Sequence, residues 1–130
     1  MKKMIDMKLL LAVPVLLLAA CESKKDAELA ASVAAGHGLI EEARVAYRAG
    51  DYDKALVLID SVRVAHPRAM NAREDGILLK DSVEMAKAEM ELKQLADTGN
   101  DNAELWDEAQ RKLKFFARKL QYDKEQRKQH

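Results

Sequence analysis

The feature that most constrains this chain is a helical period in its apolar residues, which runs from residue 26 onward. Apolar residues recur there at alternating spacings of three and four, which places them on one face of an α-helix, and no stretch alternates convincingly with the period of two typical of a strand. The 130 residues include only 5 Gly and 2 Pro, and aromatic residues make up 5%. We therefore expect a single all-α domain with a core of small and aliphatic side chains.

Turn signals divide this pattern first into a short antiparallel helical hairpin. Gly50 is expected to end the first helix in a left-handed conformation, and Asp51 to cap the second helix. His66 and Pro67 should stop the second helix, because a proline disfavours helical backbone in the residue before it.

A longer antiparallel hairpin is predicted to follow, with helices over 68–97 and 101–126. Asp101 and Glu104 resemble a capping box at the start of the fourth helix, whose tail beyond Tyr122 lacks an apolar face and should fray. The third helix carries a heptad seam typical of a coiled coil: Ala69, Ala72, Gly76, Leu79, Val83, Ala86 and Met90. The fourth carries a matching apolar face: Trp106, Ala109, Leu113, Phe116 and Leu120.

Residues 1–20 have the layout of a secretory signal peptide. A basic start precedes an uninterrupted apolar run of 12 residues, from Leu9 to Ala20. A permanent membrane span needs about 20 apolar residues, and Pro14 further weakens a long helix here.

The leader ends in Leu18-Ala19-Ala20-Cys21, which resembles the lipobox of bacterial lipoproteins. The resemblance implies that residues 1–20 are removed and that Cys21 carries a diacylglyceryl thioether and a further acyl chain such as palmitate. It implies a membrane-anchored lipoprotein of the bacterial cell envelope, and Glu22 in place of an aspartate favours the outer membrane if the cell has one. The alternative is a buried N-terminal helix with an incidental cysteine. A single Cys forms neither an internal disulfide nor a Cys-based zinc site.

Residues 21–35 are then a lipidated tether, frayed or helical, ahead of a helical domain over 36–130. Gly36 and Gly38 interrupt the first apolar face, and each costs about 1 kcal/mol in a helix interior. The first helix is expected either to begin after these two glycines or to run through them at that cost.

The 34 residues 36–69 resemble a tetratricopeptide repeat. The positions that carry the resemblance are Ala43, Ala46, Gly50, Asp51, Tyr52, Ala55, Ile59, Val62 and Pro67. A shift of 34 residues does not reproduce the pattern, so one unit is expected rather than an array. The resemblance implies a tetratricopeptide-like helical hairpin that binds a peptide or protein on the concave face of its first helix. That face would present His37, Ile40, Arg44, Tyr47 and Arg48.

Arg44, Tyr47 and Arg48 are the candidate ligand-binding residues, because two guanidinium groups that flank a tyrosine can hold a segment bearing a carboxylate. The alternative is that both arginines pair with Glu41 and other acidic residues of the domain.

Charge is balanced overall, with 22 basic and 22 acidic residues, but residues 111–130 carry a net +6 and residues 21–110 a net −8. We expect Arg111, Lys112 and Lys119 on the outer or flanking faces of the fourth helix, and the basic segment to pair mainly within the fold rather than with an anionic surface. The overall neutrality gives no argument for nucleic-acid binding.

No constellation for catalysis or metal binding is present, because His37, His66 and His130 lie far apart and no serine has a base at a recognised spacing. The chain is therefore expected not to be an enzyme, and to have no metal, no small-molecule substrate and no cofactor besides the lipid on Cys21. The favoured function is a lipid-anchored adaptor, held to the membrane by its anchor, that binds another envelope protein. The alternative is a self-associating coiled-coil tether.

Overall fold

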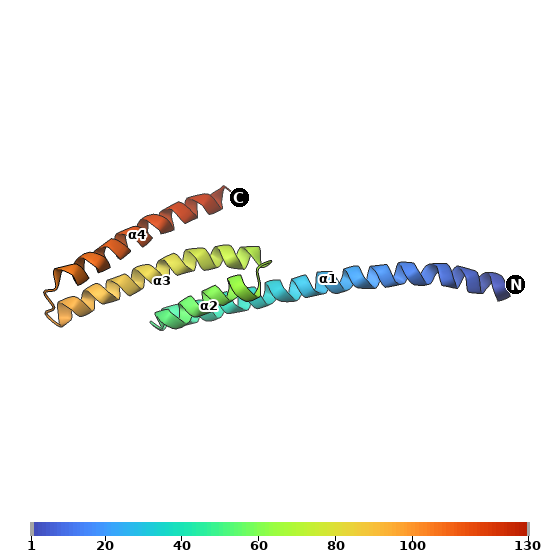
Figure 1. Cartoon of the computed structure of the whole chain (residues 1–130), viewed down its shortest axis with the longest axis horizontal. Helices are drawn as coiled ribbons and strands as arrows, with labels where there is room; N and C mark the ends of the chain where they lie inside the picture. Colours follow the sequence, from blue (N-terminus) through green and yellow to red (C-terminus); the bar gives the residue numbers. More distant parts are fainter. Residues whose placement is uncertain (1, 130) are drawn as a thin grey trace. The chain divides into compact units, whose positions relative to one another are not determined.

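The structure, a computed structural model, consists of α1 (Lys2–Arg48), α2 (Tyr52–Ala65), α3 (Met70–Asp97) and α4 (Ala103–Lys128) (Figure 1). It describes the backbone of residues 2–129 and the side chains of residues 23–129. No strand occurs among the residues described, which confirms the all-α fold. The chain divides into two compact units, Met1–Ser32 and Val33–His130.

The first unit is helical from Lys2 onward, and the side chains of residues 23–31 are exposed. The predicted signal peptide and Cys21 lie outside the residues whose side chains are described. Where side chains are described, no helix is both long enough and apolar enough to cross a membrane.

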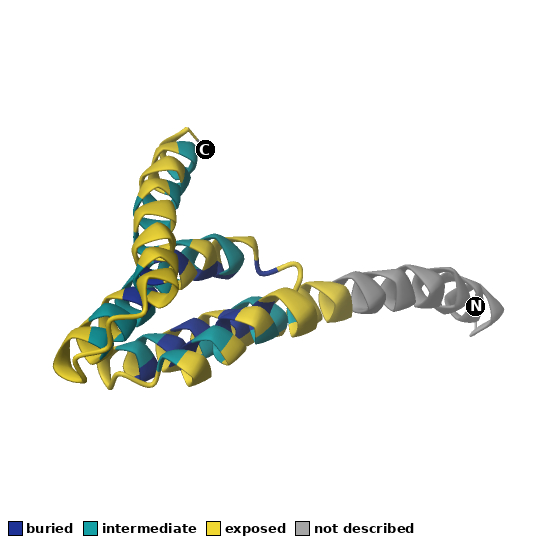
Figure 2. Cartoon of the chain, turned by 60° about the vertical axis from the view of Figure 1, so that its left-hand side comes forward, coloured by how far each residue is buried: buried dark blue, intermediate teal, exposed yellow. Residues whose placement is uncertain are grey.

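The core of the second unit lies where α2 and α3 meet the α1 segment of residues 33–48. Figure 2 shows the buried residues concentrated along these helices, whereas α4 is mostly exposed or half-buried. Most core residues are small, and small side chains let helix axes approach closely. The buried cluster comprises Ile40, Ala43, Ala46, Ala55, Ile59, Val62, Ala69, Ala72 and Val83.

Gly36 permits a close approach of α1 to the start of α3. A Cβ atom at this position would lie 2.8 Å from the Cβ of Ala69 and 3.4 Å from the Cβ of Ala72. Gly38, in contrast, has open space around it. Both glycines lie inside α1, so the helix runs through them, and the cost in helix propensity is offset at Gly36 by close packing.

Gly76 has a similar function in α3. A Cβ atom there would lie 3.3 Å from Ile40 Cδ1 of α1 and 3.3 Å from Ile59 Cγ2 of α2. The heptad seam of the third helix is therefore the face that packs against the first hairpin, with Ala72, Gly76 and Val83 buried.

The turn between α1 and α2 has the predicted chemistry. Gly50 adopts a φ of 80°, and the Asp51 amide donates to the carbonyl of Ala46, which closes a Schellman turn. The Asp51 carboxylate then accepts from the Lys54 amide at 3.3 Å and caps α2, which ends at Ala65 before His66 and Pro67.

The start of α4 corrects the predicted capping box. The cap is Asn102, whose side-chain oxygen accepts from the amides of Glu104 at 3.1 Å and Leu105 at 3.4 Å. Asn102 satisfies amides that would otherwise be free, so α4 begins at Ala103 rather than at residue 101.

The end of α4 also differs from the expectation that the chain frays beyond Tyr122. The helix continues to Lys128. Its last turns are held by charge rather than by an apolar face, since Asp123 pairs with Lys119 and Arg127 pairs with Asp75 of α3.

Candidate functional site

Two of the three predicted ligand-binding residues of α1 are engaged within the fold. Arg44 pairs with Glu41, and its Nη2 lies 3.8 Å from Asp75 Oδ2 of α3. Tyr47 packs against the core, with its ring centroid 6.1 Å from that of Tyr52. Arg48 is exposed. The geometry of Arg44 thus matches the alternative of internal pairing.

The predicted concave face requires one correction. Ile40 was expected on that face, but its side chain is 1% exposed and belongs to the core cluster. It contacts the position of Gly76 on α3, because α3 covers the side of the first hairpin that a lone repeat would leave open.

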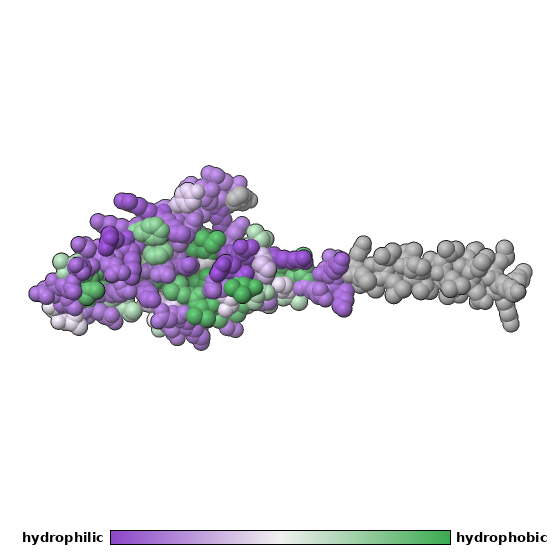
Figure 3. All heavy atoms as spheres, viewed as in Figure 1, coloured by the Kyte–Doolittle hydropathy of each residue, from purple (hydrophilic) through white to green (hydrophobic). Residues whose placement is uncertain are grey.

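An open groove lies instead between α2 and α3, with a volume of ≈ 380 Å³. Figure 3 shows apolar atoms gathered over α2 and the N-terminal half of α3, with hydrophilic atoms around them. The groove is lined by Leu56, Ile59, Asp60, Arg63, Arg73, Gly76, Ile77, Lys80 and Glu84. Its apolar floor can accept aliphatic side chains of a ligand.

The rim of the α2–α3 groove carries more positive than negative charge. Arg63 Nη2 lies 2.7 Å from Asp60 Oδ1, and Arg73 Nη1 donates to the carbonyl of Pro67 at 2.9 Å. Lys80 is exposed and forms no ion pair with any residue whose side chain is described. Between these groups Ile77 is 47% exposed. The rim therefore favours a ligand that carries a negative charge beside its apolar side chains.

The sequence did not single out this groove. Ile77 and Lys80 lie off the heptad seam of α3, and Arg63, between Val62 and Val64 on α2, belongs to no motif that the sequence indicates. Gly76 lines the groove but does not signal it, because a Cβ atom there would lie 3.3 Å from Ile40 Cδ1 and from Ile59 Cγ2 and the position is closely packed.

A charge cluster joins α3 to α4. Lys119 Nζ donates to Asp81 Oδ1 at 3.0 Å and to Asp123 Oδ2 at 2.6 Å. Asp81 is fully buried, and its second oxygen has no partner among the residues described. Lys119, whose side chain is 38% exposed, thus lies on a flanking face of α4, one of the two placements expected, and reaches inward to Asp81.

The cluster perturbs both carboxyl groups in opposite directions. Burial, together with the neighbouring Asp123 carboxyl group, raises the pKa of Asp81 to about 6. The interaction with Asp81 and the Lys119 ammonium lower the pKa of Asp123. A raised pKa can indicate a catalytic acid, but a fully buried carboxyl gives a substrate no access, so the cluster connects two helices.

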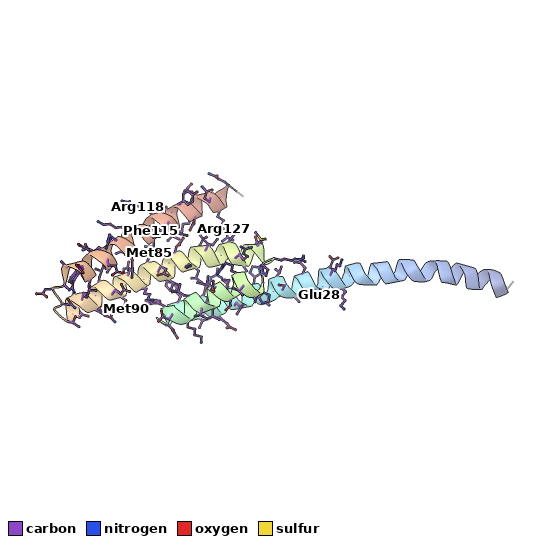
Figure 4. The ribbon with its side chains drawn as sticks, viewed as in Figure 1. Glu28, Met85, Met90, Phe115, Arg118 and Arg127 are labelled. Atoms are coloured by element: carbon purple, nitrogen blue, oxygen red, sulfur yellow. The ribbon has the colours of Figure 1, made fainter. Side chains whose placement is uncertain are left out.

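A second charge cluster lies near the C-terminus of α4. Arg127 pairs with Asp75, and its Nε lies 3.8 Å from Glu74 Oε2. Figure 4 shows Arg127 beside the N-terminal half of α3. Since Arg44 also reaches Asp75, this carboxylate connects α1, α3 and α4.

Metal binding has no support in residues 23–129, where no three His, Cys, Asp or Glu side chains gather in a way that could hold an ion. Comparison with protein-family models, with curated proteins and with solved structures finds no match. The function of the chain is therefore inferred from its own residues.

Proposed function

We propose that this chain is a lipid-anchored, non-catalytic interaction module of a bacterial cell envelope, and that its α2–α3 groove binds a segment of another protein. The observation that carries the proposal is the open apolar groove of ≈ 380 Å³ with its cationic rim. The tetratricopeptide-like pattern of residues 36–69 supports a protein-binding function for this hairpin.

The groove fits a short amphipathic segment of a partner. Leu56, Ile59 and Ile77 offer apolar contact, and burial of an aliphatic side chain on such a floor contributes about 1.5–3 kcal/mol. Lys80 is unpaired among the described side chains and is available to an acidic residue of the partner. Two exposed valines on α2, Val57 and Val64, widen the apolar area next to the groove.

Crosslinking in intact cells tests this groove. A photoreactive residue in place of Ile77 should form an adduct with one envelope protein, and Lys80→Glu should weaken that adduct because it reverses the charge of the rim. Lys93, which is exposed on α3 away from the groove, gives the matched controls: a photoreactive residue at 93 and Lys93→Glu. Equal adducts from positions 77 and 93 would contradict the proposal.

The proposed anchor is the acylated Cys21 behind the removed leader, which places the chain on a membrane, with the outer membrane favoured by Glu22. Each buried CH₂ contributes about 0.8 kcal/mol, so two or three acyl chains anchor stably where one does not. The intact mass of the purified protein should show cleavage before Cys21 together with acyl chains. A mature chain that starts elsewhere, or that lacks the acyl mass, would contradict this part of the proposal.

A second candidate function is self-association through the α3–α4 hairpin. Its apolar positions are only half-buried within one chain: Leu78, Met85, Leu92, Leu95, Leu113, Phe116 and Leu120. A helix from a second copy would cover them, as in a helical bundle. Sedimentation equilibrium over a range of concentrations distinguishes the two candidates, because an adaptor stays monomeric and a self-associating tether gains mass.

A further inference from the structure

We infer that the outer face of α4 docks on an anionic phospholipid surface. Five residues form this face, which we call the α4 outer stripe: Arg111, Lys114, Phe115, Arg118 and Tyr122. All five are exposed, and Phe115 and Arg118 project from α4 in Figure 4. Their spacings of three and four place them on one side of the helix.

The basic residues near the C-terminus fall into two classes. Lys112, Lys119, Arg127 and Lys128 each form an ion pair with an acidic side chain. Arg111, Lys114, Arg118 and Lys124 form none with the residues that the structure describes. Arg111 donates only to the backbone carbonyl of Asp107, at 3.4 Å. The first class is therefore neutralised within the fold, whereas the stripe retains three positive charges.

Two aromatic rings accompany these charges. Phe115 is 59% exposed and Tyr122 is 62% exposed, although an aromatic side chain gains most from burial. The Phe115 ring stacks edge-to-face on Phe116, at a centroid distance of 5.0 Å, which holds it at the surface of the helix. Exposed aromatic rings beside lysines and arginines are typical of helices that lie in the interface of a membrane.

The shape of the stripe favours a membrane over an acidic protein. The stripe runs along a single helix, whereas protein partners usually seat their apolar side chains in a groove such as the one between α2 and α3. Three long cationic side chains around two exposed rings match a broad surface of mobile anionic headgroups. Acidic residues limit the stripe at both ends, with Glu104, Asp107 and Glu108 in the first turns of α4 and Glu125 after Tyr122.

The inference does not depend on the anchor, because the stripe is complete within α4. If Cys21 is acylated, the anchor would hold this stripe near headgroups at a high effective concentration. If Cys21 is not acylated, the intact mass of the protein will show it. If the stripe does not dock on anionic lipid, only the labelling experiment below will show it.

Lysine labelling of the full chain tests the inference. The purified protein is bound to vesicles of phosphatidylcholine alone, or of phosphatidylcholine and phosphatidylglycerol in equal parts, and amine acetylation is followed at each lysine by mass spectrometry. Because the leader or anchor associates with both vesicles, a difference between them reports the headgroup charge. We expect Lys114 to react at least about tenfold more slowly on the anionic vesicles, and Lys54 and Lys93 to react equally on both.

A charge-matched pair of variants identifies the stripe. Each basic residue near an anionic surface contributes about fivefold in binding, so Arg111→Gln with Arg118→Gln should remove most of the protection of Lys114. Lys54→Gln with Lys93→Gln removes the same charge from α2 and α3 and should leave that protection intact. High salt should also remove it, since the Debye length is about 3 Å at 1 M.

Three outcomes would overturn the inference. Equal labelling of Lys114 on both vesicles excludes a headgroup contact. Equal protection of Lys54, Lys93 and Lys114 indicates general adsorption of the chain rather than docking by α4. Protection of Lys114 that needs added envelope protein, or that grows with the concentration of the chain, assigns the stripe to an acidic protein or to a second copy.

Discussion

The two faces of α3 bind the rest of the domain by different physical means. The face toward α1 and α2 is lined by Ala72, Gly76 and Val83, which are buried against other small or aliphatic side chains. The face toward α4 carries the buried Asp81, held by Lys119 across the helix pair. Only Ala109 of α4 is fully buried among the described residues of that helix.

One helix, α3, thus forms a tight interface with the first hairpin and a loose interface with α4. Close packing of small residues tolerates almost no change of volume, because the helices have no space to shift. An interface of half-buried side chains and ion pairs tolerates changes of volume but depends on charge and on pH. We therefore expect substitutions that change side-chain volume to destabilise the first hairpin most. Substitutions that change charge should destabilise the second hairpin most.

The largest effect is expected from Lys119→Met. This change leaves the buried Asp81 carboxylate without its cation, and removal of one partner from a buried pair costs about 3–5 kcal/mol. Because Asp81 can take up a proton instead, we expect the lower end, about 3 kcal/mol, in urea denaturation followed by circular dichroism.

Lys112→Met is the matched control for this variant. Lys112 lies two helical turns before Lys119 on the same face of α4. Its Nζ is 3.3 Å from Glu108 Oε1 and 3.9 Å from Glu91 Oε2, both at the surface. Exposed pairs contribute about 1 kcal/mol or less. If both variants lost a similar free energy of unfolding, the cluster around Asp81 would contribute no more to stability than an exposed ion pair.

Gly36→Ala tests the tight interface. The added Cβ would lie 2.8 Å from the Cβ of Ala69, which is fixed close to its backbone, so overpacking should cost about 1–3 kcal/mol. Gly38→Ala makes the same chemical change two residues later in open space and should stabilise the chain by about 0.5–1 kcal/mol through helix propensity. In thermal denaturation, a lower melting temperature for Gly36→Ala and a higher one for Gly38→Ala would support the packing. Changes of the same sign would contradict it.

The pH dependence of stability should distinguish the two interfaces. The raised pKa of Asp81 means that the folded chain binds a proton more tightly than the unfolded chain between the ordinary value of 3.8 and about 6. The free energy of unfolding should therefore fall as the pH rises through this window, by about 3 kcal/mol, and then stay level. The lowered pKa of Asp123 acts in the opposite sense, and its contribution is lost as the pH falls below about 4.

Asp81→Asn provides the control, because asparagine keeps the size of the side chain and cannot titrate. Denaturation at a series of pH values between 3 and 8 gives the free energy of unfolding as a function of pH. In the variant, this free energy should no longer fall as the pH rises. A slope unchanged by the substitution would assign the pH dependence to other groups.

The sequence predicted the helices and the tight interface because those depend on patterns that are local in the chain. Gly50, Asp51 and Pro67 mark the ends of elements, and spacings of three and four mark the buried faces of α1 and α3. The packing of Gly36 was harder to predict. A glycine lowers helix propensity whether or not another helix packs against it, and the residue that it contacts, Ala69, is 33 residues away.

The loose interface and the groove were less predictable because their partners are distant in sequence. Lys119 and Asp81 are 38 residues apart, and nothing in either helix alone indicates that a charged pair faces inward. Arg44 was a candidate ligand-binding residue for the same reason, since its contact with Asp75 depends on how α3 crosses α1.

The smallest effect concerns the start of α4, where the structure moves the predicted cap by one residue. Asn102→Ala removes an oxygen that accepts from the amides of Glu104 and Leu105, and loss of such a cap costs about 1 kcal/mol. Asp101→Ala should change the free energy of unfolding by no more than a few tenths of a kcal/mol, because this residue makes no cap to α4. Because the α3–α4 turn fixes where α4 begins on α3, weakening it should loosen the second hairpin and leave the first intact. Hydrogen exchange should therefore quicken in α4 of Asn102→Ala and remain unchanged in α2, and the reverse ranking of the two variants would restore the cap to Asp101.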